Sequence, residues 1–337
     1  MKKNKMALIF AGLLVTLIGA GVYVGVKINE NNMNNNNENI ENLPVDSTQY
    51  SYSNVYLSDN QGVLVPLTIK YESFDSLGEE LMYVTNMLKV DSKVSGTNFK
   101  GLLPSECSVN KLVLEDKHLS IDFNNEFASY DQNIELKLLE SLVWTLTDFE
   151  EVDSVSLSID GNSLSNMPVG NTPISNNITK QIGINNYLLT NSMIIDGERV
   201  LSYYEKKIDD TYYYVPVTHY VSNKQDLSIY DLTVSTMLID PGITSSLEVC
   251  RCLKDTKLVS SSIVNENILY LSLSEDILFD ETTVSLDVYE IFKEVSVLFN
   301  DVEDVSFLME LEEVMVNGKQ ENEETEVSKV ELNKYYI

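Results

Sequence analysis

The chain has 337 residues and carries 52 Asp and Glu against 23 Lys and Arg, a formal net charge of −29 at pH 7. This charge excludes nucleic acid as a partner and disfavours anionic lipid headgroups, because phosphate recognition needs clustered cations. Hydrophobic residues make up 43% of the chain, so it is expected to fold. At about 100–200 residues per domain, the length favours two domains over one.

The N-terminal region predicts export and tethering. A basic start at residues 1–5 precedes the uncharged, mostly apolar residues 6–26, which as a helix rising ~1.5 Å per residue match a hydrocarbon core of ~30 Å. Because the cationic end stays inside, we expect a single-pass cell-membrane anchor with the rest of the chain extracytoplasmic. A cleavable signal peptide, cut near residues 19–21, is the alternative. The Asn-rich residues 27–50 are expected to form a linker.

The sequence repeats itself at an offset of 150 residues. Val65-Pro66-Leu67-Thr68 aligns with Val215-Pro216-Val217-Thr218. At the same offset, residues 84–88 align with 234–238, and residues 152–157 align with 302–307. The apolar positions Leu119, Ile121 and Phe123 likewise align with Leu269, Leu271 and Leu273. Ordered matches without a gap indicate a tandem duplication.

Each copy predicts the same order of elements: hairpin, helix, two strands, helix and strand. In the first copy the hairpin covers residues 55–57 and 63–71, and apolar spacing predicts a helix over 77–88. These elements are followed by strands over 111–115 and 117–123, a second helix and a strand over 155–159. The inward residues of the second helix are Leu138, Leu139, Leu142, Val143 and Leu146. The second copy predicts a hairpin over 200–206 and 212–221, helices including residues 227–238 and 284–299, and a last strand over 305–311.

This order predicts the α+β class, with two tandem two-layer α/β sandwich domains after one transmembrane helix. Each domain is expected to hold a mixed sheet with two helices on one face. We place the domains at residues 51–165 and 199–318. A linker over residues 166–198 separates them, and residues 319–337 form an acidic tail.

Three segments of the first copy stand out: Leu119-Ser120-Ile121-Asp122-Phe123 with Glu126-Phe127, residues 144–152 with Val155, and Ile159-Asp160-Gly161. These segments resemble the GerMN domain, a family of sporulation and spore-germination proteins of endospore-forming Gram-positive bacteria. The resemblance covers about residues 50–165 and 200–318. The second copy departs from the pattern, with Ser272 in place of Asp122 and Ser296-Val297-Leu298 in place of the family's Thr-Leu-Thr.

The resemblance implies a fold similar to the ring-building domains of secretion machines. It also implies a non-enzymatic role between mother cell and forespore, where such proteins support a transenvelope complex. We therefore predict a membrane-anchored extracytoplasmic assembly or scaffold protein, with envelope proteins as partners in a homo- or hetero-oligomer. No catalytic, cofactor-binding or metal-binding residue is assigned. The alternatives are an extracytoplasmic binding module for cell-wall glycan or a small ligand, for which duplication gives avidity, and a hydrolase that uses paired carboxylates.

Acidic residues of the first copy are the first candidates for chemistry. Asp148, Glu150, Glu151 and Asp153 crowd the exit of the second helix. They could supply a carboxylate pair or calcium ligands, but the turn glycine of a calcium loop is missing, so a solvated turn is expected. Asp122 is expected to accept backbone N–H bonds from the loop that begins at residue 124.

Histidines and cysteines are few. His118 is expected to point away from the core and His219 to lie near a strand end; because they do not correspond between the copies, no shared metal site is expected. Cys250 and Cys252 lack the second cysteine pair of a zinc site, which leaves reduced thiols or a disulfide or redox pair. Cys107 lies in the corresponding loop of the first copy.

Tyrosines cluster at the second hairpin. Clustered aromatics on an edge hairpin favour a protein interface, since tyrosine brings a large contact area with few rotamers. The alternative is packing against the preceding linker. The residues are Tyr203, Tyr204, Tyr212, Tyr213 and Tyr214.

Overall fold

The computed structural model describes residues 49–96, 98–186, 197–239, 241, 246–280, 282–296, 299, 301–309, 312–317 and 333–335. The predicted membrane anchor at residues 6–26 lies outside this part, as does almost all of the linker at 27–50. Among the helices of the described residues, none combines the length and the apolar composition that crossing a membrane requires.

The first repeat opens with a long antiparallel hairpin. Strands β1 (Tyr50–Asp59) and β2 (Leu64–Glu72) pair along their length, and β3 (Phe99–Lys100) adds to the end of β1. Helix α1 (Leu77–Met87) follows, and it begins at Ser76, whose hydroxyl accepts the N–H of Glu79. This N-cap satisfies one of the backbone donors that a helix start leaves unpaired.

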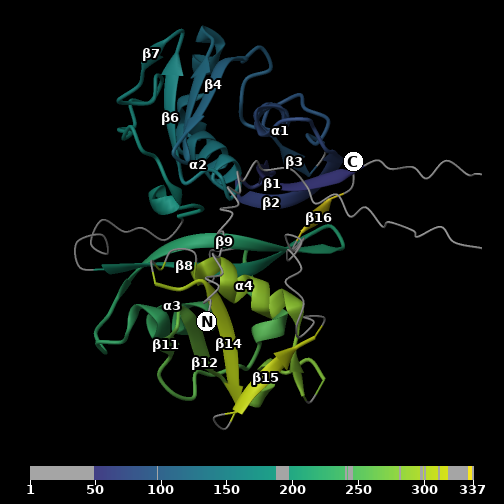
Figure 1. The fold of residues 1–337 in the computed structure, drawn as a ribbon, viewed down its shortest axis with the longest axis vertical. Coiled ribbons are helices and arrows are strands. Elements are labelled where there is room, and N and C mark those ends of the chain that lie inside the picture. The colour runs from purple at the N-terminus through teal and green to yellow at the C-terminus, as the bar shows by residue number, and fades with distance from the viewer. Residues whose placement is uncertain are drawn as a thin grey trace, which may run out of the picture. The chain divides into compact units, whose positions relative to one another are not determined.

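The rest of the first repeat forms a second sheet, in the order β4-β5-β6-β7 (Figure 1). Strand β5 (His118–Phe123) runs antiparallel to β4 (Val109–Glu115) and parallel to β6 (Ser154–Ile159). Helix α2 (Glu135–Leu146) connects the two parallel strands. A tight turn leads from β6 to β7 (Asn162–Ser163), with positive φ at Asp160 (46°) and Gly161 (77°), as such hairpin turns require.

The second repeat has the same plan. Its hairpin is β8 (Gly197–Ile208) and β9 (Thr211–Ser222), with β10 (Glu248–Val249) on β8. Strand β12 (Ile268–Ser272) is antiparallel to β11 (Ile263–Asn265) and parallel to β14 (Asp304–Met309). Strands β6 and β14 are 150 positions apart, which confirms the duplication. The remaining elements are α3 (Ile229–Met237), β13 (Thr283–Val284), α4 (Leu286–Ser296), β15 (Glu312–Val316), β16 (Lys334–Tyr335) and the 3₁₀ helices η1 (Asn125–Ala128), η2 (Gln132–Ile134), η3 (Lys180–Ile182), η4 (Arg251–Leu253) and η5 (Glu275–Ile277).

The α+β class is confirmed, but each repeat holds two sheets instead of one mixed sheet. In the first repeat α2 packs against β1 and also against β6 (Figure 1). The backbone of Tyr56 bonds to this helix: its carbonyl accepts the Ser141 hydroxyl at 2.6 Å and its N–H donates to Thr145 Oγ1 at 3.0 Å. Because helix side chains satisfy this part of the free edge of β1, the hairpin does not continue into the second sheet.

Residues 164–186, which composition places largely in a linker, pack on the first repeat. Ile178 forms an antiparallel bridge with Val155, and Met167, Ile178 and Ile184 are buried. The indole N–H of Trp144 donates to the carbonyl of Gly183 at 2.9 Å. A sequence rich in Asn, Ser and Pro predicts irregular backbone, but it does not reveal which groups bind that backbone.

One carboxylate holds much of this segment. Glu135, at the start of α2, accepts the N–H groups of Val169 (3.1 Å), Gly170 and Thr172 (3.0 Å), and also the hydroxyls of Thr172 (2.6 Å) and Tyr130 (2.7 Å). Burial raises the pKa of Glu135, but these hydrogen bonds outweigh burial and lower the pKa to about 2. The charge also lies at a helix N-terminus, where an anion is favoured.

Candidate functional site

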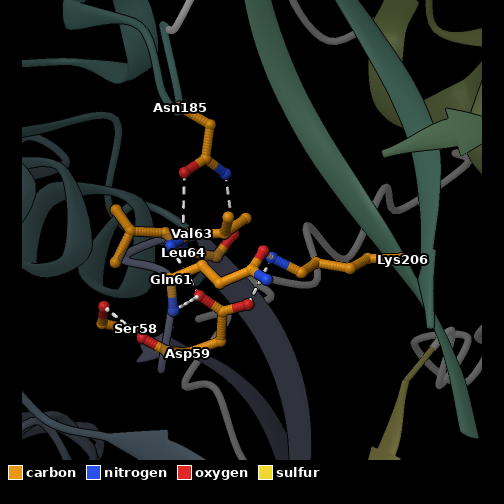
Figure 2. Close-up of polar contacts among 7 residues, drawn as sticks. All are labelled: Ser58, Asp59, Gln61, Val63, Leu64, Asn185 and Lys206. Carbon is orange, nitrogen blue, oxygen red and sulfur yellow. Dashed lines mark hydrogen bonds and ion pairs between the residues drawn. The ribbon is translucent and has the colours of Figure 1, made fainter. Parts of the chain in front are cut away.

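Buried polar contacts join the hairpins of the two repeats (Figure 2). Asn185 lies at the end of the first repeat and is 4% exposed. Its side-chain amide donates to the carbonyls of Leu64 (2.7 Å) and Pro216 (2.9 Å), and its Oδ1 accepts the N–H of Leu64 at 2.8 Å. One side chain thus bonds to the backbone of both β2 and β9.

A second asparagine, near the C-terminal end of the chain, makes the same kind of contact. Asn333 Nδ2 donates to the carbonyls of Pro66 (2.7 Å) and Tyr214 (2.8 Å), and its Oδ1 accepts the N–H of Tyr214 at 2.8 Å. Pro66 and Pro216 lack N–H groups, so a regular ladder between β2 and β9 cannot form there. The side-chain amides of the two asparagines instead bond to the backbone groups of β2 and β9 that such a ladder would have paired.

A buried ion pair also joins the repeats. Asp59 Oδ2 contacts Lys206 Nζ, and each side chain is 4% exposed. Asp59 Oδ1 accepts the N–H groups of Gln61 (2.9 Å) and Val63 (2.8 Å), and Lys206 also donates to Gln61 Oε1 at 3.0 Å (Figure 2). Asp59 therefore stabilises the turn of its own hairpin and also binds Lys206 of the other repeat. Both buried charges have hydrogen-bonded partners, as buried charges require.

The predicted tyrosine interface lies within the chain. Tyr203 is 2% exposed, and its buried phenol interacts with that of Tyr56 in the first repeat. Burial raises the pKa of both phenols well above the usual value. Tyr213 packs edge-to-face on Phe99 of the first repeat, with ring centroids 5.1 Å apart. These tyrosines contact the other repeat, whereas both sequence interpretations placed their partner in another protein or in the linker.

The side chains of the remaining three tyrosines contact the second repeat. The Tyr214 hydroxyl donates to Asp287 Oδ2 at 3.0 Å. Tyr204 is 1% exposed and its hydroxyl donates to the carbonyl of Thr236 at 3.1 Å. Tyr212 is exposed, and the Arg251 guanidinium lies 3.6 Å from its ring centroid.

A groove of about 620 Å³ is lined by residues of both repeats. The tyrosines Tyr50, Tyr52, Tyr56 and Tyr203 line it, together with Lys180, Lys293 and an excess of carboxylates. The carboxylates are Glu80, Asp148, Glu150, Glu151, Asp153, Glu290 and Glu294. With more acids than lysines, the groove favours cationic or polyhydroxyl ligands over anions.

The acidic cluster at the exit of α2 is only partly the predicted solvated turn. Glu150, Glu151 and Asp153 are exposed. The Asp148 side chain, in contrast, is 3% exposed; it lies 3.7 Å from Lys180 Nζ and accepts the N–H of Asn54 at 3.4 Å. The expectation for Asp148 was wrong, because a sequence rich in acids does not show which member meets a lysine from a distant segment.

Asp122 accepts a backbone N–H as predicted, but from a different loop. Its Oδ1 accepts the N–H of Gly161 at 2.8 Å and the hydroxyl of Ser158 at 2.6 Å. The donor turn joins β6 to β7, and the parallel pairing of β5 with β6 brings it beside Asp122. The loop at Asn124 instead bonds to residues 106 and 108.

The two histidines lie in different settings. His118 sits between Ser154 and Ser156, with ring nitrogens 2.8 and 2.9 Å from their hydroxyls. His219 is 8% exposed, packs edge-to-face on Tyr204, and burial lowers its pKa to about 4. Within the described residues, no group of three or more His, Cys, Asp or Glu side chains is placed to hold a metal ion.

All three cysteines are free thiols. Cys250 is fully buried, and its thiol donates to the carbonyl of Tyr203 at 3.5 Å. Burial raises the pKa of Cys107 to about 12, which disfavours the reactive thiolate.

Comparison with known proteins agrees with this geometry. Residues 54–165 match the family described as "Germane: Sporulation and spore germination". The spore germination protein GerM of Bacillus subtilis (strain 168) is 29% identical over 269 residues, which are 79% of this chain and 72% of that protein. The solved tandem GerMN domains of the sporulation protein GerM from Bacillus subtilis superpose with a TM-score of 0.68 at 28% identity, over 80% of this chain and 92% of theirs. The solved first GerMN domain of that protein is 32% identical over 39% of this chain and 98% of its own length, with a TM-score of 0.36.

Proposed function

The chain belongs to the GerMN family of sporulation and spore germination proteins, as a tandem-domain member, and on this premise we propose that it is a membrane-anchored assembly protein of the cell envelope. The observation that carries the proposal is the match of both repeats together to the tandem GerMN domains of GerM. The role is non-enzymatic: the repeats present surfaces to envelope proteins, in the manner of ring-building domains.

The sequence supports anchoring at the extracytoplasmic face. Residues 6–26 are uncharged and follow three lysines, and an Asn-rich stretch separates them from the first repeat. A tether of this composition holds a module near the membrane and leaves it free to meet partners.

A deletion of the gene in the source organism tests the proposal. We expect fewer heat-resistant spores, with recovery by the full chain and reduced recovery by a chain whose residues 1–26 are replaced by a cleavable signal peptide. Crosslinking in sporulating cells should capture envelope proteins with the full chain. Normal spore counts after deletion, or full recovery by the unanchored chain together with no crosslinked partner, would contradict the assembly role.

The groove favours a second candidate function, a binding module for cell-wall glycan or a small ligand. Tyr50 is 46% exposed at this groove, and exposed aromatic rings beside hydrogen-bonding groups are typical of ligand sites. Residues 49–337 should then pellet with purified peptidoglycan, and Tyr50→Ala should weaken binding. Tyr212→Ala, which removes an exposed tyrosine outside the groove lining, is the matched control. Equal binding by both variants would exclude the groove as the site.

A further inference from the structure

The contacts between the hairpins come from equivalent positions of the two repeats. The sequence offset of 150 places Leu64 and Pro66 at the positions of Tyr214 and Pro216. Strand pairing extends the alignment: Leu64 pairs with Ser58, while Tyr214 pairs with Glu205. Strand β1 therefore aligns with β8 at an offset of 147, and the second hairpin is three residues longer at its turn.

Under this alignment the two asparagines make one contact twice. Asn185 binds the N–H and carbonyl of Leu64 and the carbonyl of Pro216. Asn333 binds the N–H and carbonyl of Tyr214 and the carbonyl of Pro66. Exchanging the two repeats converts one set of bonds into the other, which is the property of an isologous, two-fold interface.

The sequence around the asparagines supports the equivalence. Ile184-Asn185-Asn186-Tyr187 follows the first repeat, and Leu332-Asn333-Lys334-Tyr335 stands near the end of the chain. Each repeat thus carries its own aliphatic-Asn-x-Tyr sequence, and both asparagines are buried at 4% exposure. We call these two asparagine contacts the clamps.

Two further pairs join a residue to its own equivalent. Tyr56 aligns with Tyr203, and these two buried phenols interact with each other across the repeats. Asp59 aligns with Lys206, and these two form the buried ion pair. In a two-fold interface, residues near the axis meet their own equivalents. The tyrosine pair would suit two identical repeats, whereas Asp59 against Asp59, or Lys206 against Lys206, would bury two like charges.

We propose that this surface is a self-complementary association surface between GerMN repeats, and that the Asp59–Lys206 pair makes it select an unlike repeat. The clamps and the tyrosine pair hold any two repeats of this type together. The ion pair stabilises the association of a first repeat with a second repeat. It destabilises the association of two like repeats from two copies of the chain. Specificity arises from the penalty on the wrong partner as much as from attraction to the right one.

Cutting the chain between the repeats tests the proposal without separate expression of either half. A protease site is inserted between residues 186 and 197 of the 49–337 fragment, whose repeats each hold a buried core. After cleavage, native mass spectrometry across a dilution series counts first–second, first–first and second–second pairs. We expect first–second pairs only, and a statistical mixture of the three would overturn the proposal.

Charge-neutral variants then test the selection. Asp59→Asn keeps the Oδ1 acceptor for Gln61 and Val63, and it should weaken the first–second pair about 100-fold and let first–first pairs appear. Lys206→Met should let second–second pairs appear. Lys207→Met removes the same charge from an exposed neighbour and should change nothing. If both interface variants still give only first–second pairs, the ion pair does not select the partner.

Isosteric variants test the clamps. A carboxylate cannot donate to the two carbonyls, so Asn185→Asp and Asn333→Asp should each raise the dissociation constant of the cleaved pair by a similar factor, about 10-fold or more. Asn186→Asp adds the same charge beside the first clamp and serves as the control. Strongly unequal effects of the two clamp variants, or an equal effect of the control, would contradict two equivalent clamps.

Discussion

The first and second repeats share every main element, yet they differ in how their polar residues are used. Most parts that contact the other repeat are preserved in kind: the proline in each second strand, the buried tyrosine in each first strand and the clamp after each repeat, with Asp59 and Lys206 as the exception. The outer sheet and the following segment diverge, with Glu135 and Asp122 of the first repeat replaced by Ser285 and Ser272. The comparison teaches that the surface between the repeats constrains the residue types more than the periphery does.

Glu135 gives the largest expected difference between the repeats. Glu135→Ala leaves the backbone donors of residues 169–172 without their acceptor, so we expect a loss of about 3–5 kcal/mol in the free energy of unfolding. Ser285→Ala, at the equivalent position, removes only a hydroxyl that accepts the Val288 N–H, and should cost about 1 kcal/mol. Urea unfolding of residues 49–337 measures both, and equal losses would show that the segment after β7 does not depend on Glu135.

The next largest expected effect is a pH dependence of the free energy of unfolding, caused by Glu140. Burial raises its pKa to about 7, while the Asn185 N–H bonded to it at 3.2 Å opposes the rise. The folded state therefore holds a proton that the unfolded state releases above about pH 4.5, so this group's stability contribution is full below pH 4.5 and falls by about 3 kcal/mol as the pH rises to 7. Glu140→Gln should remove this fall, so its stability gain over the wild type should grow from pH 5 to pH 8. A gain that stays constant across this range would refute a raised pKa.

His219 of the second repeat is expected to give the opposite pH dependence of stability. Its depressed pKa, about 4, means that the unfolded state binds a proton below pH 6.5 that the folded state refuses. Its contribution is present above pH 6.5 and falls by up to about 3 kcal/mol as the pH drops to 4. The equivalent position in the first repeat is Ile69. His219→Ile should therefore gain stability relative to the wild type as the pH falls, and urea midpoints at pH 4.5 and 7.5 measure the change. The same stability difference between variant and wild type at both pH values would contradict a buried neutral imidazole.

Much of the fold could be predicted from periodicity. Apolar spacing located both helices of each repeat and the alternating strands β5 and β12, because one buried face imposes a period. The division of each repeat into two sheets could not be predicted. In the first repeat it is accompanied by the bonds of Ser141 and Thr145 to the backbone of Tyr56, and these polar residues lie on a helix whose pattern is otherwise that of an ordinary amphipathic helix.

The interface was predicted in part. The tyrosines signalled a contact surface, but the sequence does not say whether the partner is another chain or the other repeat. Asn185 and Asn333 stand in polar, Asn-rich or charged surroundings that read as solvated, although the shared aliphatic-Asn-x-Tyr pattern was a signal that could have identified them. Lys206 and Asp59 look like ordinary surface charges at hairpin turns, and only the close approach of the hairpins buries them.

Replacing Asp122 is expected to give the smallest loss of stability, and Asp122→Ser places in the first repeat the residue that the second repeat has at this position. In the first repeat its carboxylate holds the β6–β7 turn through Gly161 and Ser158, and Ser272 takes its position in the second repeat. Asp122→Ser should cost about 1 kcal/mol, because a half-exposed turn can find water in place of the lost acceptor. Asp122→Asn keeps an oxygen acceptor and should cost less. Amide hydrogen exchange at Gly161 reports the turn directly: we expect faster exchange in the serine variant than in the asparagine variant. Unchanged exchange in both would mean that strand pairing alone holds the turn and that the carboxylate, like the serine of the second repeat, is dispensable there.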